Sequence, residues 1–154
     1  MSDWKRQTKE ISLESLPPEI ANAVQRHIER YNLGAILADA LMCIRTDSEK
    51  TRKGLFGKAE TVKLAAIVTP LWLVWSVEQP NAKPAVLSAQ LSHVTIQDYA
   101  HTPFVEMIHD SGIQVTGMFT DAGESASAFI GLEEGDIGNK FKEIVIRAAQ
   151  AAKK

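Results

Sequence analysis

The amino-acid sequence predicts a mainly β protein of the α+β class, with seven antiparallel strands between an N-terminal and a C-terminal helix. Apolar residues recur at helical spacing only near the start and at the end of the chain. Between these stretches, short apolar or alternating segments are separated by turns rich in proline, glycine and asparagine, which is typical of strands. The 154 residues are enough for one domain with its own core.

The first helix is expected within residues 15–33, after a flexible polar arm at residues 1–14. Ser15 is suited to cap this helix, and Pro17 and Pro18 fit a first turn in which backbone N–H groups lack partners. The apolar side chains that share one helical face are Ile20, Val24, Ile28 and Tyr31. We expect this face to pack on the strands.

The seven predicted strands are AILADALMCIRT, ETVKLAAIV, LWLVWSVEQ, VLSAQLSHVTIQDY, FVEMIHD, GIQVTGMFT and ASAFIGL. The first is apolar on both faces, so it should be a well-covered strand that ends near Thr46. A carboxylate within it, Asp39, would need a partner. The chain closes with EEGDIGNKFKEIVIRAAQAAKK, whose apolar residues follow helical spacing and whose acidic start and basic end suit the helix dipole.

Seven meandering strands followed by the helix FKEIVIRAAQAA resemble the pleckstrin-homology (PH)-like superfold, and specifically the small bacterial PH-like domains. The resemblance covers residues 35–154 and rests on strand number, turn placement and the terminal helix. It implies two nearly orthogonal sheets in a partly open barrel, with the helix capping one end. The N-terminal helix is then an addition to that domain. The alternative architecture is a helix-grip or other α+β barrel with an internal ligand cavity.

Composition limits the classes of function. The net charge of −2 argues against nucleic acid as a partner. The N-terminus has no apolar signal segment, so a cytoplasmic location is expected. The single cysteine, Cys43, has no partner for an internal disulfide and lies in an apolar run, which predicts a buried thiol with a raised pKa.

No pattern typical of catalysis, a cofactor or a metal site stands out, so we expect a non-catalytic protein without a cofactor. His93, His101 and His109 are eight residues apart, without a short zinc-type spacing such as HExxH, and are expected at the surface. No serine lies in a GxSxG elbow, and the GLFG stretch lacks the phosphate-loop pattern.

The stretch TRKGLFGK, residues 51–58, is the first candidate binding site. It places an apolar pair between basic residues, in a protein that is negative overall. The candidate contact residues are Lys50, Arg52, Lys53, Leu55, Phe56 and Lys58. Basic and apolar side chains together favour weak contact with an anionic membrane, and a protein or peptide ligand is also open. The simpler interpretation is a hairpin loop whose Phe56 packs on the barrel or on a partner subunit.

Two tryptophans indicate that the sheet is covered on both sides. Trp72 and Trp75 have opposite strand parity, so one should fill the core while the other is covered from outside, by the N-terminal helix or by another subunit. The candidate oligomer or helix-packing face consists of Ile20, Val24, Ile28, Tyr31, Trp72 and Trp75. Self-association into a homo-oligomer is expected, because apolar faces of this size rarely stay bare.

The sequence therefore predicts a non-catalytic PH-like interaction module, homo-oligomeric, that presents loops to a protein or anionic membrane ligand. Two other interpretations stay open. One is a barrel that binds a small apolar ligand or acts on it, and the other is a purely structural oligomer.

Overall fold

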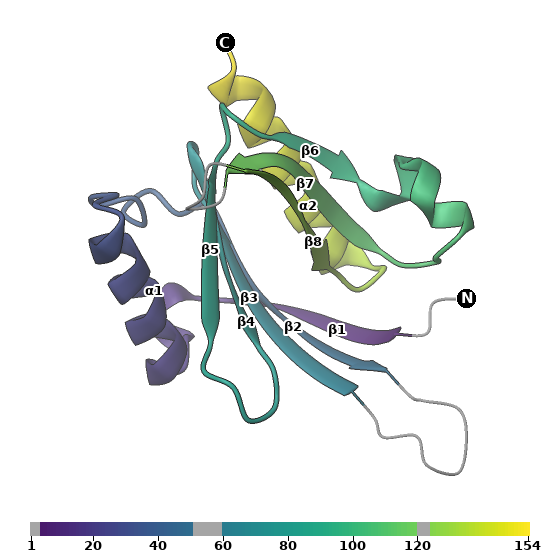
Figure 1. The fold of residues 1–154 in the computed structure, drawn as a ribbon, viewed down its shortest axis with the longest axis horizontal. Helices are drawn as coiled ribbons and strands as arrows, with labels where there is room; N and C mark the ends of the chain where they lie inside the picture. The colour runs from purple at the N-terminus through teal and green to yellow at the C-terminus, as the bar shows by residue number, and fades with distance from the viewer. Residues whose placement is uncertain (1–3, 51–59, 120–123) are drawn as a thin grey trace.

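The computed structural model describes residues 4–50, 60–119 and 124–154 of the chain, which form two antiparallel sheets and two helices (Figure 1). One sheet has the strand order β1-β2-β3-β4-β5, and the other has the order β6-β7-β8. The strands are β1 Trp4–Ile11, β2 Met42–Lys50, β3 Glu60–Val68, β4 Trp72–Glu78, β5 Ala85–Gln90, β6 Thr95–Asp98, β7 Gly112–Phe119 and β8 Ser125–Gly131. The helices are α1 Pro18–Arg30 and α2 Asp136–Ala152, and the short 3-10 helices are η1 Leu13–Ser15, η2 Tyr99–His101 and η3 Pro103–Glu106.

The main core lies between the two sheets and α2. Trp75 of β4, Ile113 of β7 and Phe141 of α2 are among its largest fully buried side chains. The α2 helix contacts β1 and β2 of the large sheet as well as β6 and β7 of the small one. The α2 helix therefore holds the two sheets together, because its apolar face packs against both of them.

A second apolar layer lies between α1 and the outer face of the five-stranded sheet (Figure 1). Alternate residues of β3 face the two layers, because Leu64 and Ala66 belong to the main core while Ala65 and Ile67 pack under α1. Both faces of β3 are thus covered, which explains why the sequence LAAIV is continuously apolar.

The α+β class, the antiparallel strands, the N-terminal helix and the C-terminal helix are confirmed. The strand predicted at residues 60–68 coincides with β3, and those predicted at residues 112–120 and 126–132 differ from β7 and β8 by one residue at the ends. These segments are strongly apolar or alternating and end in clear turn residues, so their pattern determines them locally.

The predicted number of seven strands is wrong, because the described residues contain eight. The polar segment taken for a flexible arm at residues 1–14 contains β1, which pairs with β2 over its full length. Its charged residues suit the exposed edge of a sheet. The helix begins later than the Ser15 cap implied, because η1 comes first and α1 starts at Pro18.

Three further predicted strands differ from those observed. Residues 35–41 form turns, so β2 begins only at Met42 and the carboxylate of Asp39 is exposed to water. The segment VLSAQLSHVTIQDY divides into β5 and β6, which belong to different sheets. The segment FVEMIHD overlaps η3 and forms no strand. The two sheets of five and three strands do not close into the partly open barrel that was expected.

Candidate binding site

Most of the loop predicted as a binding site falls outside the described residues. The predicted contact residues that fall there are Arg52, Lys53, Leu55, Phe56 and Lys58. Lys50 is described and is the last residue of β2, directly opposite Trp4 of β1. Its ammonium nitrogen lies 5.8 Å from the centroid of the Trp4 ring, a cation–π distance. The roles assigned to this loop stay predictions.

The predicted helix-packing face is divided between the two apolar layers. Ile20, Val24 and Ile28 are buried against the outer face of the large sheet, and Trp72 packs partly buried beside them. Trp75 points to the opposite side and lies in the main core. Tyr31, at the end of α1, stays 42% exposed. Since α1 covers this face within one chain, the face no longer requires a second subunit.

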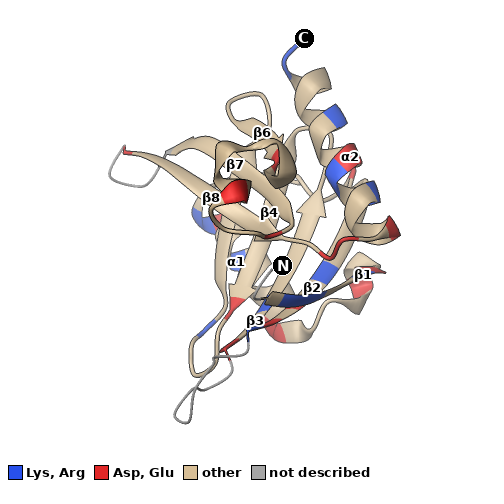
Figure 2. Ribbon diagram, turned by 90° about the vertical axis from the view of Figure 1, so that its right-hand side faces the viewer, with Lys and Arg blue, Asp and Glu red and all other residues tan. Residues whose placement is uncertain are grey.

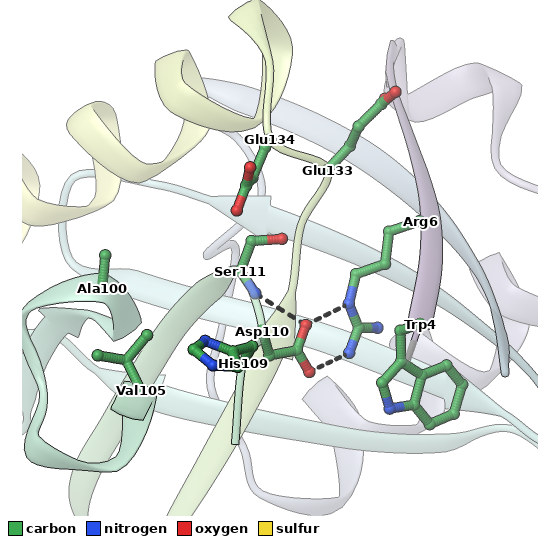
Figure 3. A pocket seen from close by; sticks show the side chains of 9 residues that line it. All are labelled: Trp4, Arg6, Ala100, Val105, His109, Asp110, Ser111, Glu133 and Glu134. Atoms are coloured by element: carbon green, nitrogen blue, oxygen red, sulfur yellow. Dashed lines mark hydrogen bonds and ion pairs between the residues drawn. The ribbon is translucent and has the colours of Figure 1, made fainter. Parts of the chain in front are cut away.

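A polar cleft of about 550 Å³ lies between β1 and the segment that precedes β7 (Figure 3). Arg6 and Asp110 point toward each other there, and the guanidinium donates from Nε to Oδ1 at 2.9 Å and from Nη2 to Oδ2 at 2.6 Å. The remaining Nη1 donates to Ser48 Oγ at 2.6 Å. The Arg6 and Asp110 side chains are only 10% and 9% exposed, so this two-pronged ion pair is nearly dry.

A second set of hydrogen bonds fastens β1 beside the ion pair. The Thr8 backbone N–H donates to Glu133 Oε2 at 2.9 Å, and the Glu133 backbone N–H donates to Thr8 Oγ1 at 2.9 Å. The Thr8 and Thr46 hydroxyls are also bonded, at 2.9 Å. These polar groups bind one another, so the cleft is a junction that fixes β1 to the rest of the fold. We call these contacts of Arg6 and Thr8 the polar junction.

A different groove, of about 410 Å³, follows the edge of β5, and we call it the β5 groove. Its lining residues are His27, Tyr31, Leu33, Trp72, Val86, Leu87, Ser88, Met118, Ala126 and Ser127. None of them is Lys, Arg, Asp or Glu. The volume falls within the range of about 300–1,000 Å³ that is common for ligand sites. The lining is therefore uncharged and largely apolar.

The β5 groove contains both faces of one edge strand. Ser88 pairs with Val74, whose side chain belongs to the layer under α1, whereas Leu87 pairs with Trp75 of the main core. In Figure 1, β5 runs between α1 on one side and β7 and β8 on the other. Among the described residues β5 pairs only with β4, so its other backbone edge has no strand partner there.

Side-chain contacts fix the α1 wall of the β5 groove. His27 Nε2 and Ser88 Oγ are hydrogen-bonded at 2.8 Å and join α1 to β5. The His27 and Tyr31 rings lie 4.8 Å apart, and the Arg30 guanidinium lies 5.3 Å from the Tyr31 ring centroid. Tyr31 is thus held as an exposed aromatic wall, and the groove is formed before any ligand arrives.

Neither the polar junction nor the β5 groove was predicted from the sequence. Arg6 and Thr8 lie within residues 1–14, which were predicted to be a flexible arm. β5 lies in a segment that was predicted to form one strand with β6, so its place at the edge of a sheet was not expected. One signal was present: AVLSAQ, the sequence of β5, contains no charged residue, although edge strands usually carry charges. This lack of charge could be interpreted only once the sheet order showed that β5 is an edge strand.

The side chains considered for catalysis or metal binding are not gathered in a site. His93, His101 and His109 are all exposed, and the described residues include no group of three or more His, Cys, Asp or Glu able to hold a metal ion. Burial raises the pKa of the Cys43 thiol to about 12, while the Arg45 charge acts in the opposite direction. At neutral pH this thiol is protonated and a poor nucleophile.

Comparisons with known proteins leave the site to be judged on its own geometry. Within the described ranges, no helix is long and apolar enough to cross a membrane. No protein-family model matches the chain, and searches against curated proteins and solved structures found no match.

Proposed function

We propose that this chain is a non-catalytic interaction module that binds an uncharged, apolar segment of a protein in the β5 groove. The observation that carries the proposal is the combination of an uncharged lining with a β5 edge that has no strand partner in the described part of the chain. Charged side chains have no partner among the lining residues, and burying an unpaired charge is costly. Apolar side chains gain free energy by leaving water there.

The order of the strands supports a PH-like fold as part of this proposal. Without β1, the chain has four consecutive strands in one sheet, three in the other and then α2. Seven strands in two sheets followed by a terminal helix are the features on which the resemblance rests. In this interpretation β1 and α1 are additions, of which α1 builds one wall of the β5 groove.

Two kinds of contact are available to a bound segment. An extended stretch along β5 forms backbone hydrogen bonds with the free edge, as in other cases of strand addition. Its side chains then point alternately toward the α1 wall, at Tyr31 and Trp72, and toward the opposite wall, at Met118 and Ala126. A segment that is apolar and uncharged can pack its side chains against both walls of the groove.

A titration with a designed peptide tests the proposal. The probe is a short acetylated and amidated peptide of alternating valine and threonine, and the matched probe has lysine in place of threonine. We expect the uncharged peptide to bind and the lysine peptide to bind at least about tenfold more weakly, a difference of about 1.4 kcal/mol. Isothermal titration calorimetry measures both affinities.

Substitution of the groove wall supplies the control. Ser127→Arg places a charge in the groove at an exposed position and should abolish binding of the uncharged peptide. Gln97→Arg adds the same charge to an exposed position on β6, outside the groove, and should leave the affinity unchanged. Equal binding by both variants, or no binding by the wild-type protein, would refute the proposal.

The alternative of a small apolar ligand between the sheets is less favoured. The opening there, of about 220 Å³, is lined by Val62, Val77 and Phe129 but also by both members of the Arg6–Asp110 ion pair. An apolar molecule entering this opening would have to cover or displace a nearly buried charge pair, which is unfavourable.

Contact of the 51–58 loop with an anionic membrane is retained as a second candidate. Lys50 and the aromatic ring of Trp4 lie together where the described part of β2 ends, and basic and aromatic side chains favour membrane interfaces. Cosedimentation with anionic vesicles should decrease in Phe56→Ser and at higher salt. Equal cosedimentation with neutral vesicles would contradict an electrostatic contact.

A further inference from the structure

The outer edge of β5 carries backbone groups that have no strand partner in the described part of the chain. The Leu91 N–H donates to the Leu71 carbonyl at 2.9 Å, in the same register as the β4–β5 ladder. Along an antiparallel strand, backbone groups point alternately to the two sides, so those of Val86, Ser88 and Gln90 point away from β4. The Gln90 carbonyl accepts a hydrogen bond from the turn that follows, which confirms this direction. The N–H and C=O groups of Val86 and Ser88 are therefore available for pairing with another strand.

A segment of this chain has the chemistry that the β5 groove is proposed to bind. It is β5 itself, AVLSAQ, which is extended and contains only apolar and uncharged polar side chains. The β4 strand already holds it in this conformation, so β5 loses little conformational entropy when it pairs with a further strand. The β5 strand of a second copy thus offers an extended backbone, an unpaired edge and no charge.

A two-fold axis matches the β5 edge to itself. In an antiparallel pair centred on Ser88, this residue lies opposite its own copy, and Val86 lies opposite Gln90 of the partner subunit. The outward backbone groups of both strands then meet in register. Because β5 has no charged side chain, no like charges face one another across the axis, an arrangement that would be destabilising. The contact is isologous, so it closes as a dimer.

The opposite edge of the large sheet is not suited to the same contact. The β1 strand contains more basic than acidic residues, and its Lys5 and Lys9 are exposed. Pairing of two β1 strands would bring like charges together, which is unfavourable. Charged side chains are a common protection of sheet edges against such pairing. We therefore expect self-pairing at β5 and not at β1.

We infer that two copies of this chain pair through β5, antiparallel and centred on Ser88, an inference that rests on the function proposed for the β5 groove. The second copy supplies the uncharged segment, and the two large sheets join into one. Both outer edges of the joined sheet are β1 strands, so the uncharged edges are covered and the charged edges stay outside. A two-fold axis perpendicular to the sheet places both α1 helices, each followed by the 42% exposed Tyr31, on the same face.

A charge exchange at Ser88 tests this pairing, because that residue faces its own copy. Ser88→Lys or Ser88→Asp alone places like charges across the axis, whereas an equimolar mixture of the two variants places opposite charges there. In sedimentation velocity from about 1 µM to about 1 mM, the wild-type protein should dimerise with increasing concentration. Each variant alone should stay monomeric, and the mixture should dimerise at least about tenfold more tightly than either variant.

Control variants separate the charge at the axis from other effects of substitution. Ser88 is partly exposed, but its hydroxyl is hydrogen-bonded to His27. Ser88→Ala removes that bond without adding charge and should dimerise like the wild-type protein. Thr95→Lys and Thr95→Asp add the same charges at an exposed position on β6 and should also dimerise like the wild-type protein.

Hydrogen exchange in the wild-type protein supplies a measurement that needs no variant. The amides of Val86 and Ser88 should exchange more slowly in the dimer than in the dilute monomer, while exchange along β1 should not change. A monomeric wild-type protein, wild-type dimerisation of Ser88→Lys or Ser88→Asp alone, or a mixture of folded variants that does not dimerise would overturn the inference. Exchange at the β5 amides that does not depend on concentration would also overturn it.

Peptide binding separates the inference from the proposed function. The uncharged peptide is titrated into wild-type protein at a concentration at which the protein is monomeric. If the peptide binds but the protein dimerises at no concentration, the inference falls and the proposed function stands. If the protein neither dimerises nor binds the peptide, both fall.

Discussion

The two edges of the five-stranded sheet differ in chemistry. The β1 edge has the sequence WKRQTKEI, rich in charge, and its Arg6 and Thr8 are fastened by the polar junction. Basic and acidic residues appear along β1 and α2 in Figure 2. The β5 edge has the sequence AVLSAQ, without charge, and borders an apolar groove. Charged edges resist pairing with other chains, whereas uncharged edges permit it. The β1 edge is therefore protected from pairing, and the β5 edge permits it.

The largest expected effect on stability comes from disrupting the ion pair that holds β1 in place. Asp110→Ala removes one partner of a nearly buried ion pair and leaves the Arg6 guanidinium without its carboxylate. We expect the free energy of unfolding to fall by about 3–5 kcal/mol, measured by urea denaturation. Glu106→Ala removes an exposed acid from the same connection and should change it by less than about 0.5 kcal/mol. An equal effect of both substitutions would contradict a structural role for the junction.

Alkaline pH probes the buried layer at the other end of β1. Cys43 pairs with Ile11 and lies under α1, and burial raises the pKa of its thiol to about 12 from 9.0. Because the folded state holds this proton more tightly, the stabilising contribution is complete below pH 9 and decreases as the pH rises toward 12. The slope is about 1.4 kcal/mol per pH unit in that window.

The comparison with Cys43→Ala isolates this contribution from the titration of lysines and tyrosines. Stability against urea, measured between about pH 7 and 11, should fall more steeply in the wild-type protein than in the variant. Parallel pH profiles would show that the thiol does not stay buried and protonated.

A smaller effect is expected from Thr8. Thr8→Val keeps the shape of the side chain but leaves the Glu133 N–H and the Thr46 hydroxyl without this partner. We expect a loss of about 1–3 kcal/mol in the free energy of unfolding, since unsatisfied buried polar groups carry such a penalty. Thr95→Val, at an exposed position on β6, is the matched control and should be nearly neutral. A neutral Thr8→Val would contradict the importance of these bonds.

The smallest effect on stability is expected from removing the charges on β1. The double substitution Lys5→Thr and Lys9→Thr affects exposed residues and should change the free energy of unfolding by less than about 0.5 kcal/mol. It should nevertheless increase aggregation, measured by light scattering, because β1 then keeps only Arg6 and Glu10 of its four charged side chains. Lys83→Thr with Lys153→Thr lowers the net charge equally at exposed positions away from β1. Equal aggregation of both double variants would show that net charge, not the edge, is responsible.

The sequence was sufficient where a segment is regular over its whole length. ETVKLAAIV and the amphipathic terminal helix could be assigned because their periods are unambiguous. The opposite parity of Trp72 and Trp75 predicted an apolar layer on each face of the large sheet. The two side chains do lie on opposite faces.

The candidate site could not be read from local patterns. Arg6 and Asp110 are 104 residues apart, and their pairing depends on how β1 meets the connection before β7. Residues 104–110 were predicted as a strand because of their apolar side chains, yet η3 occupies Pro103–Glu106 and the Tyr99 hydroxyl donates to the Ile108 carbonyl. The β5 groove combines residues from four separate parts of the chain, namely α1 with the turn after it, β4, β5 and the β7–β8 pair, so it can be recognised only once the sheet order is known.

The most direct test of the β5 groove is amide hydrogen exchange with and without the uncharged valine–threonine peptide. The account predicts slower exchange at the β5 amides, residues 85–90, with no change along β1, residues 4–11. It also predicts that Ser127→Arg abolishes the protection of β5. Protection of β1, or unchanged exchange at β5 while the peptide is bound, would contradict the assignment of the open edge as the binding site.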